Sequence, residues 1–377
     1  MNYKVLQGDC IESLKTLDDE SINCCVTSPP YWGLRDYGTA TWVGGDPSCS
    51  HKRDSKFSES CSTGQRNLEG AIGDGIYKTK CPRCGAIRKD NQLGLEETPE
   101  EYVANMVKVF SEVKRVLTKD GTLWLNLGDS YAAQRGGTHQ PAESLAGGKG
   151  GRTESGDRVN RDRHDGYNPS RNANKIGLKH KDLVGIPWRV AFALQADGWY
   201  LRQDIIWHKP NPMPESVTDR CTKAHEYIFL LSKSSKYYYD HDAVKEKAQT
   251  NGERPTLEER YAKGEPKRHG LAGAAACGAG GFGVSEDGTR NKRSVWTVNT
   301  KPYKEAHFAT FPKKLIRPCI QAGCPKGGVV LDPFGGSGTT AEVANGLGRD
   351  AILCELNPEY CELIKKRLSL TQMEMFA

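Results

Sequence analysis

The chain has 377 residues, enough for one large α/β domain or two medium ones, and its formal net charge of +6 permits a polyanionic partner without requiring one. The N-terminal sequence MNYKVLQGD lacks the apolar region of a secretion signal, and no stretch approaches the ~20 apolar residues of a membrane span, so we expect no membrane association. The 13 cysteines are scattered and several lie in apolar runs, which is typical of reduced thiols in a cytoplasmic protein.

Apolar strand-like runs alternate with helical patterns along most of the chain, which predicts an α/β fold with a parallel sheet. The clearest helical pattern recurs every three or four positions from Tyr102 to Leu117. Lys119, Asp120 and Gly121 then predict a turn before the next strand. We expect strands at 3–9, 22–28, 120–129, 200–209, 226–233, 328–334 and 350–356, and helices at 10–17, 99–117, 186–198, 312–323, 339–348 and 358–368.

Three stretches break this alternation. Residues 40–92 are polar and contain cysteines, residues 132–181 are rich in Gly, Arg, Asn and Asp, and residues 245–300 carry charges and a run of small residues. Long segments without periodicity inside a compact domain are commonly functional or mobile loops. We therefore expect these three stretches to be insertions in the α/β domain.

A glycine-rich turn joins a buried strand to a helix in VVLDPFGGSGTTAEVANGLG. Gly335, Gly336 and Gly338 let the backbone approach a ligand and place helix-terminal N–H groups against it. The turn lacks the Gly-Lys-Ser/Thr ending of a phosphate-binding loop, and Asp332 would repel a phosphate but attract an ammonium group. The next strand ends at Glu355, which is placed to hydrogen-bond a ribose. S-adenosylmethionine carries both an ammonium group and a ribose, so it fits the two carboxylates. A dinucleotide is the alternative ligand.

Two motifs resemble those of amino-methylating DNA methyltransferases. DPFGGSGTT resembles the motif that binds the methionine part of the cofactor, and TSPPYW, near the N-terminus, resembles the catalytic motif. Their order is similar to that of the β class of these enzymes, and DIIWHKPNPMPES and RCTKAHEYIFLLSK also look like later motifs of the family. The resemblance implies a circularly permuted Rossmann-like, S-adenosylmethionine-dependent methyltransferase sheet.

The resemblance also implies roles for parts of the chain. Residues 1–39 and 93–244 would form the catalytic half of the methyltransferase domain, and 301–377 the cofactor-binding half. The stretch 245–300 would be the target-recognition region, and 132–181 a basic flexible loop. The implied cofactor-binding residues are Asp9 near the adenine, Thr310, Phe311 and Pro312 before the glycine-rich turn, Asp332, Pro333, Phe334, Gly336, Gly338 and Thr339 within it, and Glu355 beyond it.

The segment Ser28-Pro29-Pro30-Tyr31 fits methyl transfer to the amino group of a base. Such a nitrogen is a poor nucleophile because its lone pair is delocalised into the ring. Two acceptors, which we assign to the Ser28 hydroxyl and the Pro29 carbonyl, would draw the nitrogen toward tetrahedral geometry and free the lone pair for in-line attack on the sulfonium methyl. The two prolines fix the direction of that carbonyl, and Tyr31 would stack on the base.

The residue before Pro-Pro-Tyr bears on which base is methylated. In this family Ser usually accompanies cytosine N4 methylation, whereas Asp or Asn accompanies adenine N6, so Ser28 favours cytosine N4. Adenine N6 is the alternative, because a hydroxyl can accept from either amino group. A base in a duplex must be flipped out to reach such a pocket. A non-catalytic DNA-binding module is disfavoured by the intact motifs, and methylation of RNA or a protein amide by their order and the long insertions.

The first insertion contains the pattern of a metal site. Cys81 and Cys84 form a Cys-x-x-Cys-Gly knuckle with the spacing of half a tetrahedral zinc site, and Cys49 and His51 are the expected other half, with Cys61 as a substitute for either. Because the polar insertion offers little core, a structural zinc would supply much of its folding energy. A catalytic deaminase zinc is disfavoured, because no Glu follows the His or Cys ligands in the required motif.

Duplex DNA is the expected partner, and a cognate restriction endonuclease is a further candidate. The stretch 132–181 holds ten Lys or Arg residues against five acids, which suits phosphate contacts but also a solvated loop. The stretch 245–300 offers further basic residues for target recognition: Arg254, Arg260, Lys267, Arg268, Arg290, Lys292 and Arg293.

Overall fold

The computed structural model describes residues 2–33, 39–52, 71–72, 76–77, 79–133, 176–248, 288–300 and 311–376, and the side chains of the last helix as far as residue 369. The helices are α1 (Cys10–Lys15), α2 (Pro99–Val116), α3 (Ile186–Ala196), α5 (Lys313–Gly323), α6 (Thr339–Asn345) and α7 (Pro358–Phe376), with a short 3-10 helix, η3 (Asp242–Val244). The strands are β1 (Tyr3–Gln7), β2 (Ile22–Thr27), β3 (Thr41–Val43), β4 (Ala71–Ile72), β5 (Ile76–Tyr77), β6 (Ile87–Lys89), β7 (Leu117–Leu127), β8 (Tyr200–His208), β9 (His225–Ser232), β10 (Glu246–Lys247), β11 (Thr289–Arg290), β12 (Val295–Thr297), β13 (Val329–Asp332) and β14 (Asp350–Glu355).

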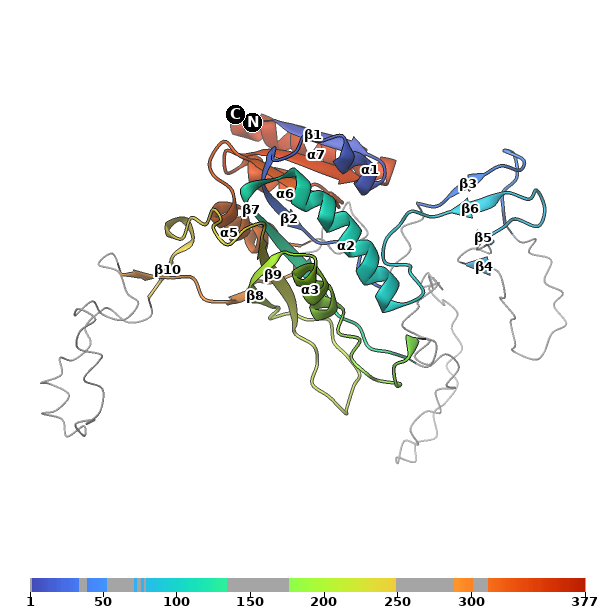
Figure 1. Cartoon of the computed structure of the whole chain (residues 1–377), viewed down its shortest axis with the longest axis horizontal. Helices are drawn as coiled ribbons and strands as arrows, with labels where there is room; N and C mark the ends of the chain where they lie inside the picture. The colour runs from blue at the N-terminus through green and yellow to red at the C-terminus, as the bar shows by residue number, and fades with distance from the viewer. Residues whose placement is uncertain are drawn as a thin grey trace, which may run out of the picture.

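One mixed sheet dominates the fold, with the strand order β1-β14-β13-β2-β7-β9-β8-β12. The five strands from β1 to β7 run parallel, whereas β9 is antiparallel to both of its neighbours. The strand before the glycine-rich turn, β13, is late in the chain but central in the sheet, and the first strand, β1, lies at an edge. This is the circularly permuted α/β sheet that the motif order implied. In Figure 1 the two ends of the chain accordingly lie close together.

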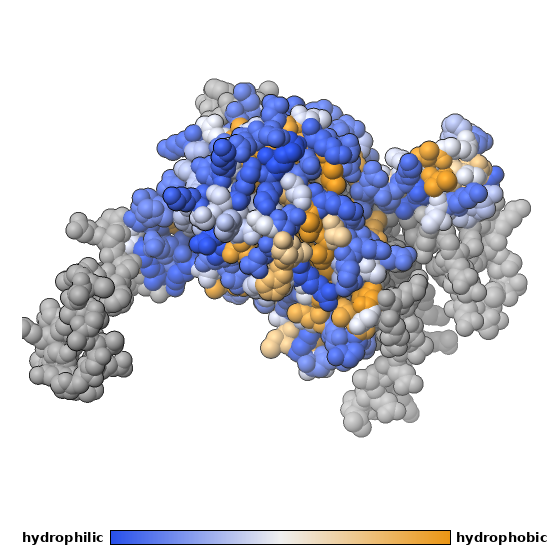
Figure 2. Space-filling model, viewed as in Figure 1, coloured by the Kyte–Doolittle hydropathy of each residue, from blue (hydrophilic) through white to orange (hydrophobic). Residues whose placement is uncertain are grey.

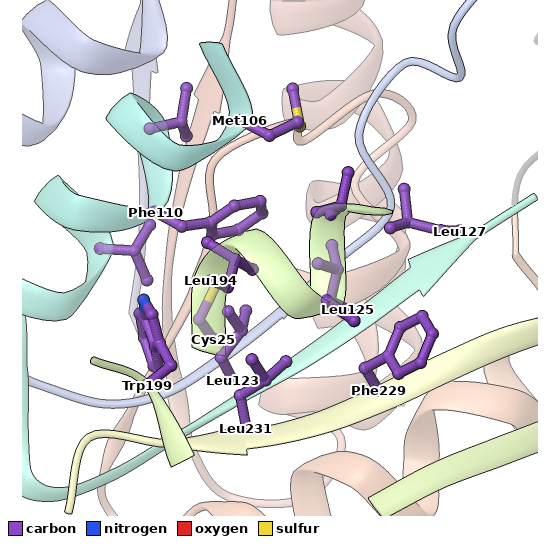
Figure 3. Close-up of a cluster of buried hydrophobic side chains, with 14 of the residues drawn as sticks. Cys25, Met106, Phe110, Leu123, Leu125, Leu127, Leu194, Trp199, Phe229 and Leu231 are labelled. Atoms are coloured by element: carbon purple, nitrogen blue, oxygen red, sulfur yellow. The ribbon is translucent and has the colours of Figure 1, made fainter. Parts of the chain in front are cut away.

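Both faces of the sheet are covered by helices, so its central strands are apolar on both sides. The side chains of Leu123, Leu125 and Leu127 pack on the face covered by α1, α2 and α3, together with the residues shown in Figure 3. The intervening Trp124 packs on the opposite face with α5, α6 and α7. This burial on both faces explains why the strands read as continuous apolar runs rather than as alternating ones.

Helix α2 begins as its sequence predicts. The Thr98 side chain accepts a hydrogen bond from the Glu101 amide, and Pro99 occupies the first turn, where its missing N–H loses nothing. The buried face of α2 includes Tyr102, whose position matters for the site described below.

Two local features differ from the sequence-based expectation of a parallel sheet with a turn before β7. First, β9 runs antiparallel, because the chain returns from β8 into the gap beside β7. Second, Lys119 and Gly121 lie within the bounds of β7 rather than before it. The residues that predicted the turn instead interrupt the pairing of β7 with β2. Ile22 pairs with Leu117 but Cys24 pairs with Thr122, so residues 118–121 bulge out of the ladder.

The described part of the first insertion forms a small module around the antiparallel pair β3–β6. In Figure 1 this module lies apart from the main sheet, beyond the start of α2. Val43 and Ile87, which pair across the two strands, are both exposed, and Figure 2 shows hydrophobic residues on the outer surface of the module. The module therefore buries little apolar surface of its own.

Candidate active site

A pocket opens where four neighbouring parallel strands end. Ser28 follows β2, Asp332 ends β13, Glu355 ends β14 and Asp9 follows β1, and all four line the pocket. Strand β13 connects through α6 to β14 on one side, whereas its other neighbour, β2, leads away toward β7. The carboxyl ends of strands at such a reversal of direction are where open α/β sheets bind their ligands.

The glycine-rich turn is shaped by backbone that other residues adopt poorly. Gly336 and Gly338 have φ values of +50° and +79°, and a Cβ on Gly338 would lie 3.1 Å from Ile364 of α7. Arg367 of the same helix donates hydrogen bonds to the Ser337 carbonyl at 2.9 Å and to Thr339 Oγ1 at 3.1 Å. The last helix thus holds the turn against the sheet.

Asp332 is 1% exposed and ties the turn to β2. Its Oδ1 accepts hydrogen bonds from Thr27 Oγ1 at 2.6 Å and from the Phe334 amide at 3.1 Å, and its Oδ2 accepts one from Thr340 Oγ1 at 2.6 Å. Burial raises the pKa of Asp332 to about 7 despite these three donors. Because each carboxylate oxygen can accept two hydrogen bonds, Oδ2 retains capacity for one more donor.

Two further carboxylates line the pocket at neighbouring strand ends. Glu355 accepts hydrogen bonds at 2.8 Å from the amides of Gly336 and Asn357, one on each oxygen, and burial raises its pKa. The Oδ1 of Asp9 accepts hydrogen bonds from the Ile11 and Glu12 amides, so this carboxylate caps α1 at the pocket's edge. The carboxyl group of Asp9 therefore has a structural task that the motif alone did not predict.

The other residues predicted to bind the cofactor divide into two groups. Phe311, Pro333, Phe334, Gly336 and Thr339 line the pocket. Pro312 and Gly338 do not line it: they precede the first turns of α5 and α6 and so support its wall. Thr310 lies outside the described residues, as does Cys61. Sequence analysis did not predict the part of the wall that includes Thr39 and Leu93, the two residues that flank the first insertion.

The Ser28–Tyr31 segment leaves β2 toward this pocket, and Ser28 and Pro30 line it. The Pro30 carbonyl accepts a hydrogen bond from the Tyr102 hydroxyl at 2.9 Å. In the part of the chain that the structure describes, no group donates to the Pro29 carbonyl. Of the two proline carbonyls, the one that we assigned to the substrate is therefore the one that accepts no hydrogen bond from the described residues.

A polar network that sequence analysis missed surrounds Tyr31. Its hydroxyl donates to Glu226 Oε2 at 2.8 Å, lies 3.2 Å from Asn126 Oδ1, and is 3.4 Å from the Ser28 hydroxyl. Lys209 forms an ion pair with the other oxygen of Glu226. In the sequence these polar residues are recognisable only by their position at the ends of apolar strands. They come together in space because β9 is antiparallel, which the sequence did not reveal.

The ring of Tyr31 is held close to the backbone around it. A Cβ on Gly128 would lie 2.5 Å from the ring's Cε2, and a Cβ on Gly94 would lie 2.9 Å from the Tyr31 carbonyl oxygen. Neither position has space for a larger residue, so Gly128 lets the Tyr31 ring, and Gly94 the Tyr31 backbone, pack against the neighbouring chain.

The four predicted metal ligands come together in the first insertion. The side-chain ligand atoms of Cys49, His51, Cys81 and Cys84 all lie within 4.8 Å of one another. Within the cluster, Cys49 Sγ lies 3.8 Å from Cys81 Sγ, and Cys84 Sγ lies 3.5 Å from His51 Nδ1. His51 has a φ of +52°, unusual for a residue with a side chain, and its ring stacks on Trp42 at 4.2 Å.

Most of the two basic stretches lies outside the described residues. Residues 134–175 of the basic loop and residues 249–287 of the expected target-recognition region are not described. Arg290 and Arg293, which are described, both pair with Glu246. Among the described helices, none combines the length and apolar character needed to cross a membrane.

Comparison with known proteins agrees with this geometry. A family model described as DNA methylase matches residues 22–366. Type II methyltransferase M.SmaI of Serratia marcescens is 40% identical over 366 residues, which cover 97% of this chain and 90% of the relative. Type II methyltransferase M.Cfr9I of Citrobacter freundii is 40% identical over 364 residues, which cover 97% of this chain and 87% of the relative.

Among solved structures, PvuII DNA methyltransferase (cytosine-N4-specific) matches with a TM-score of 0.51 and 17% identity, covering 96% of this chain and 84% of that one, so the two share a fold. Together with the family match and the 40% identical relatives, this leads to one conclusion. The chain belongs to the N4/N6 family of S-adenosylmethionine-dependent DNA methyltransferases.

Proposed function

We propose that this enzyme methylates the exocyclic N4 of cytosine at a specific sequence in duplex DNA, by base flipping and direct transfer. The observation that carries the proposal is the placement of Ser28 on the pocket wall, together with the carbonyl of the next residue, Pro29, to which no described group donates a hydrogen bond. Two acceptors at this point match the two N–H groups of an amino nitrogen. The cytosine assignment depends on Ser28, since in this family Asp or Asn usually stands in that place in enzymes that methylate adenine N6.

The pocket residues fit S-adenosylmethionine, which supplies an electrophilic methyl group on a sulfonium. Asp332 has one vacant acceptor position for an ammonium group, and Glu355 can accept from a ribose diol. Phe311 and Phe334 provide apolar walls. We propose that these side chains hold the cofactor, with Asp9 near the adenine, so that the bound methyl lies on the Ser28 side of the pocket.

Sequence specificity can be tested together with the chemistry. The chain is expressed in a bacterial host that lacks DNA methylation of its own, and the host genome is read by single-molecule sequencing, which detects modified bases in place. We expect modified cytosines at one recurring short sequence. Modified adenines, or modified cytosines without a shared sequence, would overturn this part of the proposal.

We further propose roles for the segments around the pocket. The stretch 245–300 would read the target sequence, and the basic loop within 132–181 would contact DNA phosphates. Because the 40% identical relatives are named Type II methyltransferases, a restriction endonuclease of the same specificity is the proposed partner in the cell.

We also propose that Cys49, His51, Cys81 and Cys84 bind a structural zinc ion. A tetrahedral site with Zn–S bonds of about 2.3 Å and Zn–N bonds of about 2.0–2.1 Å has S–S edges of ~3.8 Å and S–N edges of ~3.5–3.6 Å. The Cys49 Sγ–Cys81 Sγ separation of 3.8 Å and the Cys84 Sγ–His51 Nδ1 separation of 3.5 Å match these edges. The ion would join the two ends of a module that buries little apolar surface, and so stabilise it.

Zinc removal is expected to weaken cofactor binding as well as destabilise the module. Thr39 and Leu93, which flank the module, line the same pocket as Asp332, so loosening the module should disturb that wall. In the wild type we expect one zinc per chain by plasma mass spectrometry. In Cys81→Ser we expect that zinc to be lost, and S-adenosylmethionine to bind several-fold more weakly by calorimetry. Cys221→Ser is the matched control, because Cys221 is an exposed cysteine outside the cluster.

The two readouts separate the two claims in the zinc prediction. A purified protein without stoichiometric zinc would rule out the metal site. Normal cofactor affinity in zinc-free protein would instead leave the metal site intact and contradict its contribution to the pocket.

A further inference from the structure

The acceptor role proposed for Ser28 depends on the direction in which its hydroxyl hydrogen points. A hydroxyl carries one hydrogen and two lone pairs, so it can either donate or accept toward a substrate. To accept a hydrogen bond from an amino group, the Ser28 hydroxyl must direct its hydrogen elsewhere. An Asp carboxylate or an Asn carbonyl in the same place carries no hydrogen and can only accept. An enzyme with Ser in this place therefore needs a second group that binds the hydroxyl hydrogen.

The structure contains a chain of hydrogen bonds with the required direction. Ser28 Oγ lies 3.4 Å from the Tyr31 hydroxyl, and that hydroxyl lies 2.8 Å from Glu226 Oε2. An ionised carboxylate can only accept, so the Tyr31 hydrogen must point to Glu226. The Tyr31 oxygen is then available to accept the Ser28 hydrogen, which leaves the lone pairs of Ser28 for the substrate.

The competing acceptor, Asn126, is weaker and is itself oriented. Its Oδ1 lies 3.2 Å from the Tyr31 hydroxyl, farther than the carboxylate, and neutral acceptors form weaker bonds than ionised ones. Its Nδ2 donates to the Tyr227 carbonyl at 3.0 Å and approaches Glu226 Oε2 at 3.5 Å. The amide therefore helps to hold the carboxylate in place.

Lys209 holds the other side of Glu226. It pairs with Oε1, and its ammonium lies 4.2 Å from the centre of the Trp207 ring. The side chains of Lys209 and Glu226 are each 17% exposed, so the pair is largely shielded from water. Burial, and after it the charge of Glu226, raise the pKa of Tyr31 well above its ordinary value, so the Tyr31 hydroxyl keeps its hydrogen across the working pH range.

We propose that Glu226 is a positioning residue that fixes the direction of the Ser28–Tyr31 hydrogen bonds and thereby makes Ser28 an acceptor for the target amino group. The inference rests on the proposed function, in which Ser28 accepts from the base. The Ser28–Tyr31 separation of 3.4 Å is long for a bond between hydroxyls, and such bonds commonly tighten when substrate binds.

A double-mutant cycle tests this proposal. Tyr31→Phe removes the hydroxyl and keeps the ring, and Glu226→Gln removes the charge and keeps the shape. We expect each to lower the single-turnover rate of methylation roughly ten- to hundredfold, the effect of losing one charge-assisted hydrogen bond. Because both act through one chain of hydrogen bonds, the double variant should be no slower than the slower single variant. Affinity for S-adenosylmethionine should be unchanged in all three.

Glu112→Gln is the matched control, because it removes the carboxylate of another partly exposed ion pair, with Arg115 on α2, without touching Tyr31. It should methylate at the wild-type rate. Multiplicative losses in the double variant would overturn the proposal, as would a Glu226→Gln variant that loses cofactor affinity or stability to the same degree as activity.

A second background separates this inference from the proposed function. In Ser28→Asn the acceptor is a carbonyl, which needs no hydrogen to be directed, so Glu226→Gln should slow that variant far less than it slows the wild type. If Ser28→Ala retains full activity, the proposed role of Ser28 fails. If Ser28→Ala is inactive but Tyr31→Phe and Glu226→Gln retain full rates, only the role of Glu226 fails.

Discussion

Replacing Ser28 by alanine should lower the rate of methyl transfer by roughly 10²–10³-fold, the usual effect of removing one preorganised hydrogen-bonding group from a transition state. The expected loss is in kcat, because the Ser28 hydroxyl would act on the nitrogen as it becomes tetrahedral. Affinity for S-adenosylmethionine should be unchanged, since the cofactor contacts that we propose come from Asp332, Glu355 and their neighbours. Single-turnover kinetics and calorimetry measure the two quantities separately.

Ser21→Ala provides a control from the same part of the chain. Ser21 lies just before β2, at the end of the strand opposite to Ser28, and its hydroxyl donates to the Asp18 carbonyl. This variant should have wild-type kinetics. Wild-type kcat in Ser28→Ala would contradict the assigned acceptor role.

The second large effect is expected at Asp332, where one substitution should change binding and stability in opposite directions. Asp332→Asn keeps the shape but removes the charge that would meet the cofactor's ammonium. Loss of one partner from a buried charge pair commonly costs ~2–5 kcal/mol, so we expect at least ~30-fold weaker S-adenosylmethionine binding. The amide can be accommodated, because the Thr340 hydroxyl, which now donates to Oδ2, has the Val26 carbonyl 3.5 Å away as another acceptor.

The stability effect follows from the pKa of Asp332. Its value of about 7 in the cofactor-free protein lies above the ordinary 3.8, so the folded state binds the proton more tightly than the unfolded state. The wild type should therefore lose stability as pH rises from about 4 to about 7, by an amount on the order of 4 kcal/mol at most. Asp332→Asn carries no such charge and should be more stable than the wild type at pH 8 but not at pH 4.

Thermal unfolding of the cofactor-free proteins at pH 4, 6 and 8 measures this difference. A wild type that equals or exceeds Asp332→Asn in stability at pH 8 would show that the carboxylate is not a destabilised group. If Asp332→Asn is instead the more stable protein at pH 8, Asp332 is a residue whose burial is tolerated in the folded protein because its charge serves cofactor binding.

Much of the fold could be predicted because its signals are local. Helix α2 was predicted by the period of its apolar residues, and the glycine-rich turn between β13 and α6 by residues adjacent in sequence. The Cys81–Cys84 knuckle is equally local, and its partners Cys49 and His51 lie in the same insertion. The motifs then implied which strand ends would meet, and Ser28, Asp332 and Glu355 do line one pocket.

The interactions that the sequence did not predict depend on distant segments. Glu226 reaches Tyr31 only because β9 inserts antiparallel between β7 and β8, a matter of tertiary pairing rather than of local pattern. The choice between the Pro29 and Pro30 carbonyls depends on Tyr102, which is more than 70 residues further along and donates to Pro30. Asp9 shows the converse: its place at the pocket was implied by resemblance, but its role as the cap of α1 is visible only in the structure.

The most direct test of the central claim is the identity of the methylated nucleoside. The purified enzyme is incubated with labelled S-adenosylmethionine and mixed-sequence duplex DNA, and the DNA is digested to nucleosides and analysed by mass spectrometry. Ser28→Ala, incubated for the same short time, is the control with strongly reduced activity. The proposed role of Ser28 predicts labelled N4-methylcytosine. Labelled N6-methyladenine in its place would contradict the cytosine assignment, and no labelled nucleoside at all would contradict activity on DNA.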